Sequence, residues 1–305
     1  MSAELAALLT KRRVLIVDGA MGTMLQQNGL GLGDCPELFN IDHADVIQWI
    51  HEEYLKAGAD LIITNTFGGS PKKLAMFGEN HRTEEINRAG AELAAKARRT
   101  LVKEGTALVF GSVGPTGELL EPLGTTTPDE MLAQFVRQIQ ALKDGGVDGV
   151  IVETMLSPEE AIIAARAAKA VSADLAVIVN LTYDPTPRGP RTVMGTSPEA
   201  FLEAISGEWV VVDGVGTNCG TGADDMMLVV ESLRAKTDLP IAAYPNAGMP
   251  RMKDGVAVYD QPPEEFADKA RRLFDAGATM IGGCCGTTPE HIRLLSQRLS
   301  NVRSV

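Results

Sequence analysis

The chain has 305 residues, of which 45% are hydrophobic and 22% charged, and its net charge at pH 7 is −12. This composition is typical of a globular protein with a large core, and the acidic balance with scattered basic residues argues against a nucleic-acid partner. No apolar run reaches the roughly 18 residues that a membrane-spanning helix needs. The N-terminus does not resemble a signal peptide, so we expect a cytoplasmic protein whose four cysteines are free or bind metal.

One pattern recurs eight times along the chain: an apolar, β-branched run is followed by an amphipathic stretch with helical periodicity. The apolar runs do not alternate with polar residues, which is typical of parallel strands covered on both faces. The predicted strands are residues 14–20, 61–67, 108–114, 149–155, 176–183, 210–219, 240–248 and 280–286. The predicted helices are residues 43–57, 83–103, 128–143, 158–171, 198–205, 223–236, 263–276 and 289–299.

Eight βα units predict a single (β/α)8 TIM barrel over residues 1–305, with a doubly wound sheet as the alternative. No linker rich in Gly, Pro or Ser divides the chain. The carboxyl ends of the strands form the active-site face of such a barrel, and all the long irregular segments follow strand C-termini. These segments are residues 68–80, 114–127, 184–196 and 246–261.

Three cysteines stand at the ends of predicted strands. Cys219 ends the sixth strand, and Cys284 and Cys285 end the eighth, so a barrel brings them to one face. Neighbouring residues of a strand point to opposite sides, so Cys284 and Cys285 reach one ion only if the backbone bends at the flanking glycines. Three thiolates would leave one position open on a tetrahedral zinc ion, as in catalytic sites. The alternative is three buried core thiols. Cys35, in a polar loop, is interpreted as a bystander without partners.

Five segments, in order along nearly the whole chain, resemble motifs of the homocysteine S-methyltransferase family. They are residues 18–23 (DGAMGT), 111–115 (GSVGP), 153–154 (ET), 218–219 (NC) and 282–286 (GGCCG). The resemblance implies a (β/α)8 barrel in which Cys219, Cys284 and Cys285 hold Zn²⁺ and the sulfur of homocysteine takes the open position. Zinc lowers the pKa of the substrate thiol, so that a nucleophilic thiolate exists at neutral pH.

The resemblance also implies the substrate contacts. Asp18 and Glu153 match positions that hold the amino group of homocysteine; a turn or cap role is the alternative for Asp18, whereas Glu153 at the end of an apolar strand is costly without a partner. Backbone N–H groups near Gly19 and Ala20 are expected to bind the substrate carboxylate. Asn246 is expected to fill the fourth zinc position when substrate is absent, with a turn-forming role as the alternative.

Further segments of the sequence bear on the methyl donor. Three segments look more like the methionine synthase module of the family than like its betaine-dependent enzyme: residues 64–67, 191–195 and 245–250. The betaine enzyme has a Tyr in place of Phe67, and a quaternary ammonium calls for an aromatic cage, which the chain does not obviously form. The aromatic candidates are Tyr183, Tyr244 and Trp209.

We therefore expect a methylcorrinoid on a separate protein, because no Asp-x-His-x-x-Gly signature of a cobalamin-binding module is present. One alternative is a one-chain methyltransferase that uses a small onium donor, S-methylmethionine or betaine. A second is a zinc-dependent methyltransferase acting on another thiol. A third, a zinc-binding scaffold with an inactive site, is disfavoured because all three cysteines and both carboxylates are present.

Overall fold

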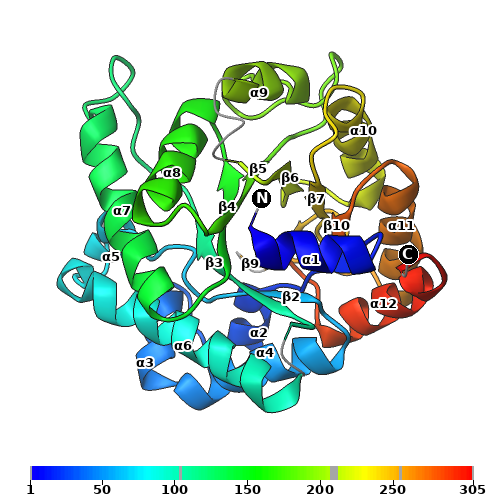
Figure 1. The fold of residues 1–305 in the computed structure, drawn as a ribbon, viewed down its shortest axis with the longest axis horizontal. Helices are drawn as coiled ribbons and strands as arrows, with labels where there is room; N and C mark the ends of the chain where they lie inside the picture. The colour runs from blue at the N-terminus through cyan, green and yellow to red at the C-terminus, as the bar shows by residue number, and fades with distance from the viewer. Residues whose placement is uncertain (1, 103–104, 207–211, 254–255, 304–305) are drawn as a thin grey trace.

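A computed structural model describes residues 2–102, 105–206, 212–253 and 256–303. Eight parallel strands form its central barrel, in the order β1-β10-β7-β6-β5-β4-β3-β2, and a bridge between Val17 and Leu61 joins the two ends of that order (Figure 1). The predicted (β/α)8 barrel is thus confirmed. The strands are β1 (Leu15–Ile16), β2 (Leu61–Ile63), β3 (Leu108–Val113), β4 (Gly149–Met155), β5 (Ala176–Leu181), β6 (Gly214–Asn218), β7 (Ile241–Tyr244) and β10 (Met280–Ile281).

Eight long helices surround the barrel, each within a few residues of its predicted position. They are α4 (Ala44–Lys56), α6 (Thr83–Leu101), α7 (Pro128–Asp144), α8 (Pro158–Val171), α9 (Pro198–Ile205), α10 (Ala223–Arg234), α11 (Pro263–Asp275) and α12 (Pro289–Arg303). Their starts follow from local chemistry: Thr127 and Glu130 form a capping box at α7, and Ser157 caps α8. The expected end of the second helix at Lys103 and the start of the sixth strand at Val210 lie outside the described residues.

Several predicted strands are too long at their C-terminal ends. The first, second, seventh and eighth were expected to reach residues 20, 67, 248 and 286, but β1, β2, β7 and β10 end at Ile16, Ile63, Tyr244 and Ile281. The apolar pattern continues past these points, but there the backbone leaves the ladder and turns across the barrel mouth. The three cysteines, Asp18 and Asn246 therefore lie beyond the strand ends, whereas Glu153 lies within β4.

Several shorter elements complete the structure. They are α1 (Ala3–Lys11), α2 (Met21–Gln27), α3 (Phe39–Asp42), α5 (Pro71–Ala75), the 3-10 turns η1 (Pro36–Leu38) and η2 (Asn80–Arg82), and the antiparallel pair β8 (Arg251–Lys253) and β9 (Val256–Val258). Two segments expected to be irregular are therefore structured in part: residues 68–80 contain α5, and residues 246–261 contain the β8–β9 hairpin. Apart from α1 and α2, these elements are runs of three to five residues, which are too short to show a periodicity in the sequence.

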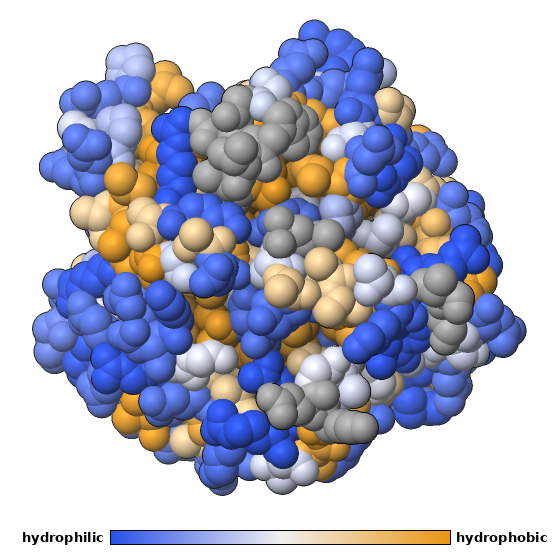
Figure 2. Space-filling model, in the orientation of Figure 1, coloured by the Kyte–Doolittle hydropathy of each residue, from blue (hydrophilic) through white to orange (hydrophobic). Residues whose placement is uncertain are grey.

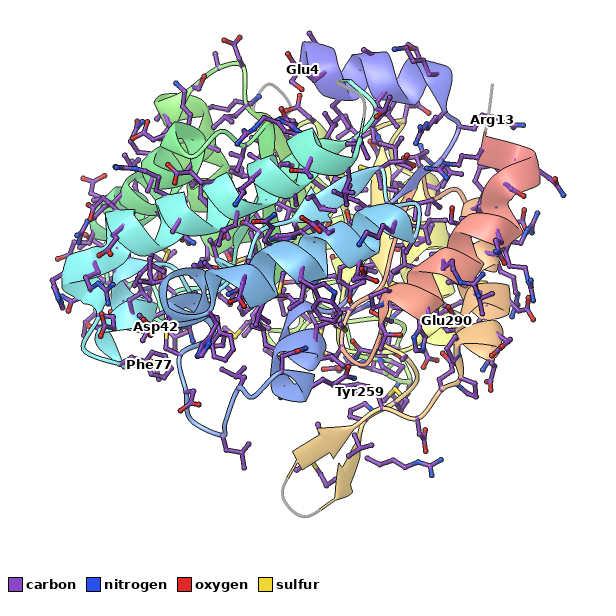
Figure 3. The ribbon with its side chains drawn as sticks, turned by 90° about the horizontal axis from the view of Figure 1, so that it is seen from below. Glu4, Arg13, Asp42, Phe77, Tyr259 and Glu290 are labelled. Atoms are coloured by element: carbon purple, nitrogen blue, oxygen red, sulfur yellow. The ribbon has the colours of Figure 1, made fainter. Side chains whose placement is uncertain are left out.

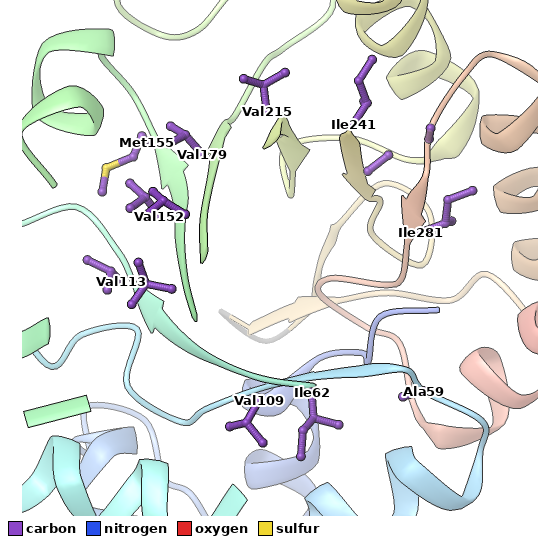
Figure 4. Packing of buried hydrophobic residues seen from close by; sticks show 14 of the residues in the cluster. Ala59, Ile62, Val109, Val113, Val152, Met155, Val179, Val215, Ile241 and Ile281 are labelled. Atoms are coloured by element: carbon purple, nitrogen blue, oxygen red, sulfur yellow. The ribbon is translucent and has the colours of Figure 1, made fainter. Parts of the chain in front are cut away.

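Two apolar cores hold the barrel together. The larger lies between strands and helices, where side chains such as Ile62, Val152 and Ile281 point outward (Figure 4). The smaller fills the barrel interior, and Leu5 and Leu8 of α1 belong to it, so α1 closes the N-terminal end. On this closed face hydrophilic residues cover the outer helices (Figure 2). Among the described residues, none of the helices has the length and apolar character needed to span a bilayer.

The two ends of the barrel differ. α1 caps one end, and the β8–β9 hairpin projects from the opposite end (Figure 3). The open end carries the C-termini of the barrel strands, where the candidate site residues were expected.

Candidate metal and substrate site

A cavity of about 410 Å³ opens at the C-terminal ends of the strands. Of the eight site residues expected from the sequence, all except Asn246 line it. The expected residues in the wall are Asp18, Gly19, Ala20, Glu153, Cys219, Cys284 and Cys285. Other lining residues, for which the sequence predicted no role in homocysteine or metal binding, include Met21, Glu37, Thr64, Ser112, Asn218 and Tyr244.

The three cysteines converge on one point. Their sulfurs all lie within 4.8 Å of one another, and the Cys219 and Cys285 sulfurs are 3.9 Å apart. Sulfurs bound to one zinc ion at about 2.3 Å in a tetrahedron are separated by about 3.8 Å, so the cluster fits such an ion. In the described part of the chain this is the one group of three potential metal-ligating side chains of this kind.

The backbone bends as the flanking glycines indicated. Gly286 has a φ of +83°, and the N–H of Thr287 donates to the carbonyl of Cys284 at 3.1 Å, closing a turn. Cys219 itself adopts a φ of +60°, followed by Gly220 at +68°. These turns, rather than strand geometry, let Cys284 and Cys285 share one centre.

The chemistry of the sulfurs also fits a cation. In the absence of metal, hydrogen bonds to Cys219 and Cys285, with burial, raise the pKa of Cys284 well above its ordinary value. Hydrogen bonds from Cys219 and Cys284 lower the pKa of Cys285. The three thiols thus interact with one another, and a bound divalent cation would compensate the charge of the thiolates that hold it.

Asp18 and Glu153 place two carboxyl groups in the cavity wall. Burial raises the pKa of Asp18 well above its ordinary value, although the N–H of Ile63 donates to this carboxylate at 2.7 Å, and the charge of Glu153 raises that pKa further. Burial also raises the pKa of Glu153, to about 7, against the opposing hydrogen bond from the Ser112 hydroxyl at 2.5 Å. Two carboxyl groups with raised pKa values in one cavity are suited to bind a cationic group.

Asn218 links the carboxylate to the metal-ligating turn. Its side-chain amide donates to Glu153 at 3.3 Å and to the Thr154 hydroxyl at 2.8 Å, and its carbonyl accepts from the N–H of Thr154 at 2.8 Å. Thr154 has a φ of +57°; among the described non-glycine residues, only it and Cys219 have positive φ. Such conformations cost energy and concentrate at functional sites. The Asn-Cys motif pointed to this place, but its sequence could not indicate the hydrogen bonds.

The expected carboxylate-binding turn is only partly available. The N–H of Ala20 donates to the Thr287 hydroxyl at 3.0 Å, so this donor is already engaged. Gly19 has no room for a side chain, since a Cβ there would lie 2.7 Å from the Thr287 hydroxyl oxygen and 2.9 Å from the Tyr54 ring. Without substrate, Ala20 is thus tied to the turn after Cys285, and binding of the substrate carboxylate by the backbone near Gly19 and Ala20 stays a prediction.

Glu37 fixes the turn after β2 and was missed by sequence reasoning. Its carboxylate accepts from the N–H of Gly68 at 2.6 Å, and burial raises its pKa. Asn65 is held nearby through its donation to the carbonyl of Pro36 at 2.7 Å. Cys35 was expected to have no partner, but its buried thiol donates to Glu37 at 3.4 Å. Burial raises the pKa of Cys35 to about 12, so it remains a thiol outside the cluster.

Asn246 lies behind the cavity wall, 1% exposed. Its neighbours are bonded to the cysteine turn: the carbonyl of Pro245 accepts from Cys284 at 2.8 Å, and the N–H of Ala247 donates to Cys285 at 2.9 Å. The side-chain oxygen of Asn246 is buried and has no hydrogen-bond partner. A buried oxygen without a partner, in the segment bonded to the cysteine turn, is available to accept a hydrogen bond or bind an ion.

Known proteins are similar to this chain in sequence and in fold. A model of the family described as homocysteine S-methyltransferase matches residues 15–299. The methionine synthase of Mycobacterium leprae (strain TN) is 34% identical over 294 residues, which make up 92% of this chain and 24% of that protein. The methionine synthase of Mycobacterium tuberculosis (strain ATCC 25618 / H37Rv) is 32% identical over 304 residues, 96% of this chain and 25% of that protein. The chain thus spans about a quarter of the length of these curated relatives.

Solved structures agree with these sequence matches. The metallated form of the homocysteine methyltransferase MmuM from Escherichia coli superimposes with a TM-score of 0.80 at 28% identity, covering 97% of this chain and 99% of that one. Its oxidized form gives a TM-score of 0.81 at 27% identity over the same shares.

Proposed function

Because the chain belongs to the homocysteine S-methyltransferase family, we propose that it transfers a methyl group to the sulfur of homocysteine and so forms methionine. The observation that carries this proposal is the meeting of the three sulfurs, within 4.8 Å of one another, with two carboxyl groups in one cavity. In this proposal residues 1–305 act as one homocysteine-binding module.

The sulfur and the ammonium group of the substrate each have proposed partners. Cys219, Cys284 and Cys285 would hold a zinc ion, with Asn246 as a further ligand before substrate arrives. When bound, zinc would lower the pKa of the substrate thiol. Asp18 and Glu153 would bind the ammonium group, whose positive charge relieves the repulsion between them. The wall of the cavity excludes most water from this ion pair, which strengthens it.

The proposed donor is a methylcorrinoid carried by another protein. Two observations support it: the relatives named methionine synthase are about four times as long as this chain, and the aromatic residues lining the cavity are Phe67 and Tyr244. Tyr244 is only 2% exposed, and Tyr183 is 1% exposed and lies outside the cavity wall, so neither offers a cage for a quaternary ammonium. Trp209 lies outside the described residues.

A donor comparison tests this part. Zinc-loaded protein is mixed with homocysteine and, in parallel, with free methylcobalamin, S-methylmethionine or betaine, and methionine is measured by mass spectrometry. We expect methionine with methylcobalamin alone. Turnover with either onium compound and not with methylcobalamin would favour the one-chain alternative.

The identity of the thiol is tested separately. Calorimetry with a panel of thiols on zinc-loaded protein should give the tightest binding for homocysteine, because both the sulfur and the ammonium group find partners. Tighter binding of a thiol that lacks the amino group would favour a methyltransferase for another substrate. No binding of any thiol would favour a zinc-binding scaffold.

A further inference from the structure

The chain between β7 and α11 folds back onto the cysteine turn. The N–H of Gln261 donates to the carbonyl of Ala247 at 3.2 Å, and the N–H of Ala247 donates to the carbonyl of Cys285 at 2.9 Å. Ala247, at the start of this segment, is therefore bonded directly to Cys285, a proposed zinc ligand. Gln261, at its end, is linked to Cys285 through Ala247. The β8–β9 hairpin forms its outer part, and Tyr259 stands at the base of the hairpin (Figure 3).

Tyr259 packs against the turn that carries the ligands. A Cβ added to Gly286 would lie 2.2 Å from the Tyr259 Cβ and 2.6 Å from its Cγ, so only glycine lets the tyrosine come this close. The returning chain is fixed one turn later, because the ring Nε2 of His291 is 3.1 Å from the carbonyl of Gln261. The segment that carries Tyr259 is thus held by residues of the β10–α12 turn and of α12.

The hydroxyl of Tyr259 reaches the sulfurs. It lies within interaction range of the sulfur of Cys285, and Cys219 and Cys284 also interact with it electrostatically. The amide nitrogen of Asn218 lies 4.0 Å from the sulfur of Cys284. Cys285 immediately precedes Gly286, the residue on which Tyr259 packs.

We propose, building on the proposed zinc chemistry, that Tyr259 is a positioning residue for the metal: its hydroxyl donates to the sulfur of Cys285 and orients that sulfur toward the shared ion. Hydrogen bonds to ligating atoms fix their direction and tune what they donate. A hydrogen bond draws charge from a thiolate, so Cys285 donates less electron density than Cys219 or Cys284. The three ligands are chemically unequal as a result.

Tyr259→Phe isolates this hydroxyl, because the phenyl ring keeps its packing on Gly286. The protein is loaded with Co²⁺ as a spectroscopic probe, and its sulfur-to-cobalt charge-transfer band is recorded. We expect the band to move to longer wavelength in the variant, since a thiolate without its hydrogen bond is more easily oxidised. Zinc affinity, measured by competition with a chromophoric chelator, should fall about tenfold.

Tyr183→Phe is the matched control. Tyr183 is 1% exposed, its hydroxyl has no hydrogen-bond partner, and it does not line the site cavity. Its loss should leave both the band and the zinc affinity unchanged. An unshifted band with unchanged affinity in Tyr259→Phe would overturn the positioning role. A wild-type protein that shows no charge-transfer band would instead overturn the proposed zinc site itself, so the two failures are distinguishable.

Discussion

The three sulfurs lie on turns at the barrel mouth, where Cys284 packs against the edge of the smaller apolar core. Cys219, Cys284 and Cys285 are only partly buried, whereas the core residues next to them, such as Met280 and Ile281, are fully enclosed. Replacing one of these cysteines should therefore remove a metal ligand without unfolding the protein, because few apolar contacts are lost with a cysteine side chain.

Replacing one ligand tests this separation. Cys284→Ala and Cys219→Ala should each abolish stoichiometric zinc and methyl transfer, while circular dichroism shows an intact barrel. Zinc content is measured by elemental mass spectrometry. Cys35→Ala serves as the control, since its thiol contacts Glu37 and lies outside the cluster, and it should keep full zinc. Retention of zinc by Cys284→Ala would contradict the three-ligand site.

Glu153 gives a prediction on pH. Its pKa rises from 4.5 to about 7 in the folded, metal-free protein, mainly through burial, so the folded state binds the proton more tightly than the unfolded state. Its contribution to stability is thus full below pH 4.5 and is lost as the pH rises through about 7, by at most about 3 kcal/mol.

The comparison is between wild type and Glu153→Gln in urea, both metal-free, at pH 5 and pH 8. As the pH rises from 5 to 8, the free energy of unfolding of wild type should fall relative to that of the variant by up to about 3 kcal/mol. The comparison cancels His51, whose pKa burial lowers to about 4 and whose effect on stability has the opposite sign. An equal difference at both pH values would show that Glu153 does not titrate in this range.

At the scale of elements, one arrangement recurs at the N-terminal ends of the strands. The residue just before β2, β4 or β6 is an aspartate whose carboxylate accepts the backbone N–H of the preceding barrel strand. The pairs are Asp60 with Ile16 at 2.9 Å, Asp148 with Val109 at 2.7 Å, and Asp213 with Val177 at 2.8 Å. Before β10, the Thr279 hydroxyl accepts from Ile241 at 3.1 Å. These clamps fix the register of neighbouring strands.

Removing one clamp should destabilise the barrel without affecting the site. Asp148→Ala leaves the N–H of Val109 unpaired and Arg98 without its partner, which should lower the free energy of unfolding by about 2 kcal/mol in urea. Asp144→Ala, an exposed position at the end of α7, should change it by less than about 0.5 kcal/mol. Equal effects of the two substitutions would show that the clamp contributes little.

These elements show what the sequence could and could not predict. The period of the apolar runs and the Ser-Pro or Thr-Pro caps were enough to predict the barrel and all eight long helices. The three cysteines could be brought together because parallel strands end at one face. Glu37, Asn218 and Tyr259 were missed, because their roles depend on hydrogen bonds across turns between segments far apart in the chain, and such contacts leave no periodic signal.

At the scale of the whole molecule, metal removal should weaken the protein without unfolding it. Chelation with EDTA should leave the far-ultraviolet circular dichroism unchanged and lower the melting temperature by roughly 5–10 °C, because an ion that binds only the folded state adds stability. Added zinc should restore the original value, whereas magnesium, which prefers oxygen ligands, should not. Unfolding on chelation would mean that the ion holds the fold itself together.

The position of the clamps has one more consequence. Asp60, Asp148 and Asp213 lie at the end of the barrel that α1 closes, and the sulfurs lie at the end from which the hairpin projects (Figure 3). Mutational tolerance should therefore be divided along the barrel axis. Loops at the mouth, including the excursion that carries Tyr259, are the segments to exchange when grafting a different donor preference, since the register of the strands is set at the far end.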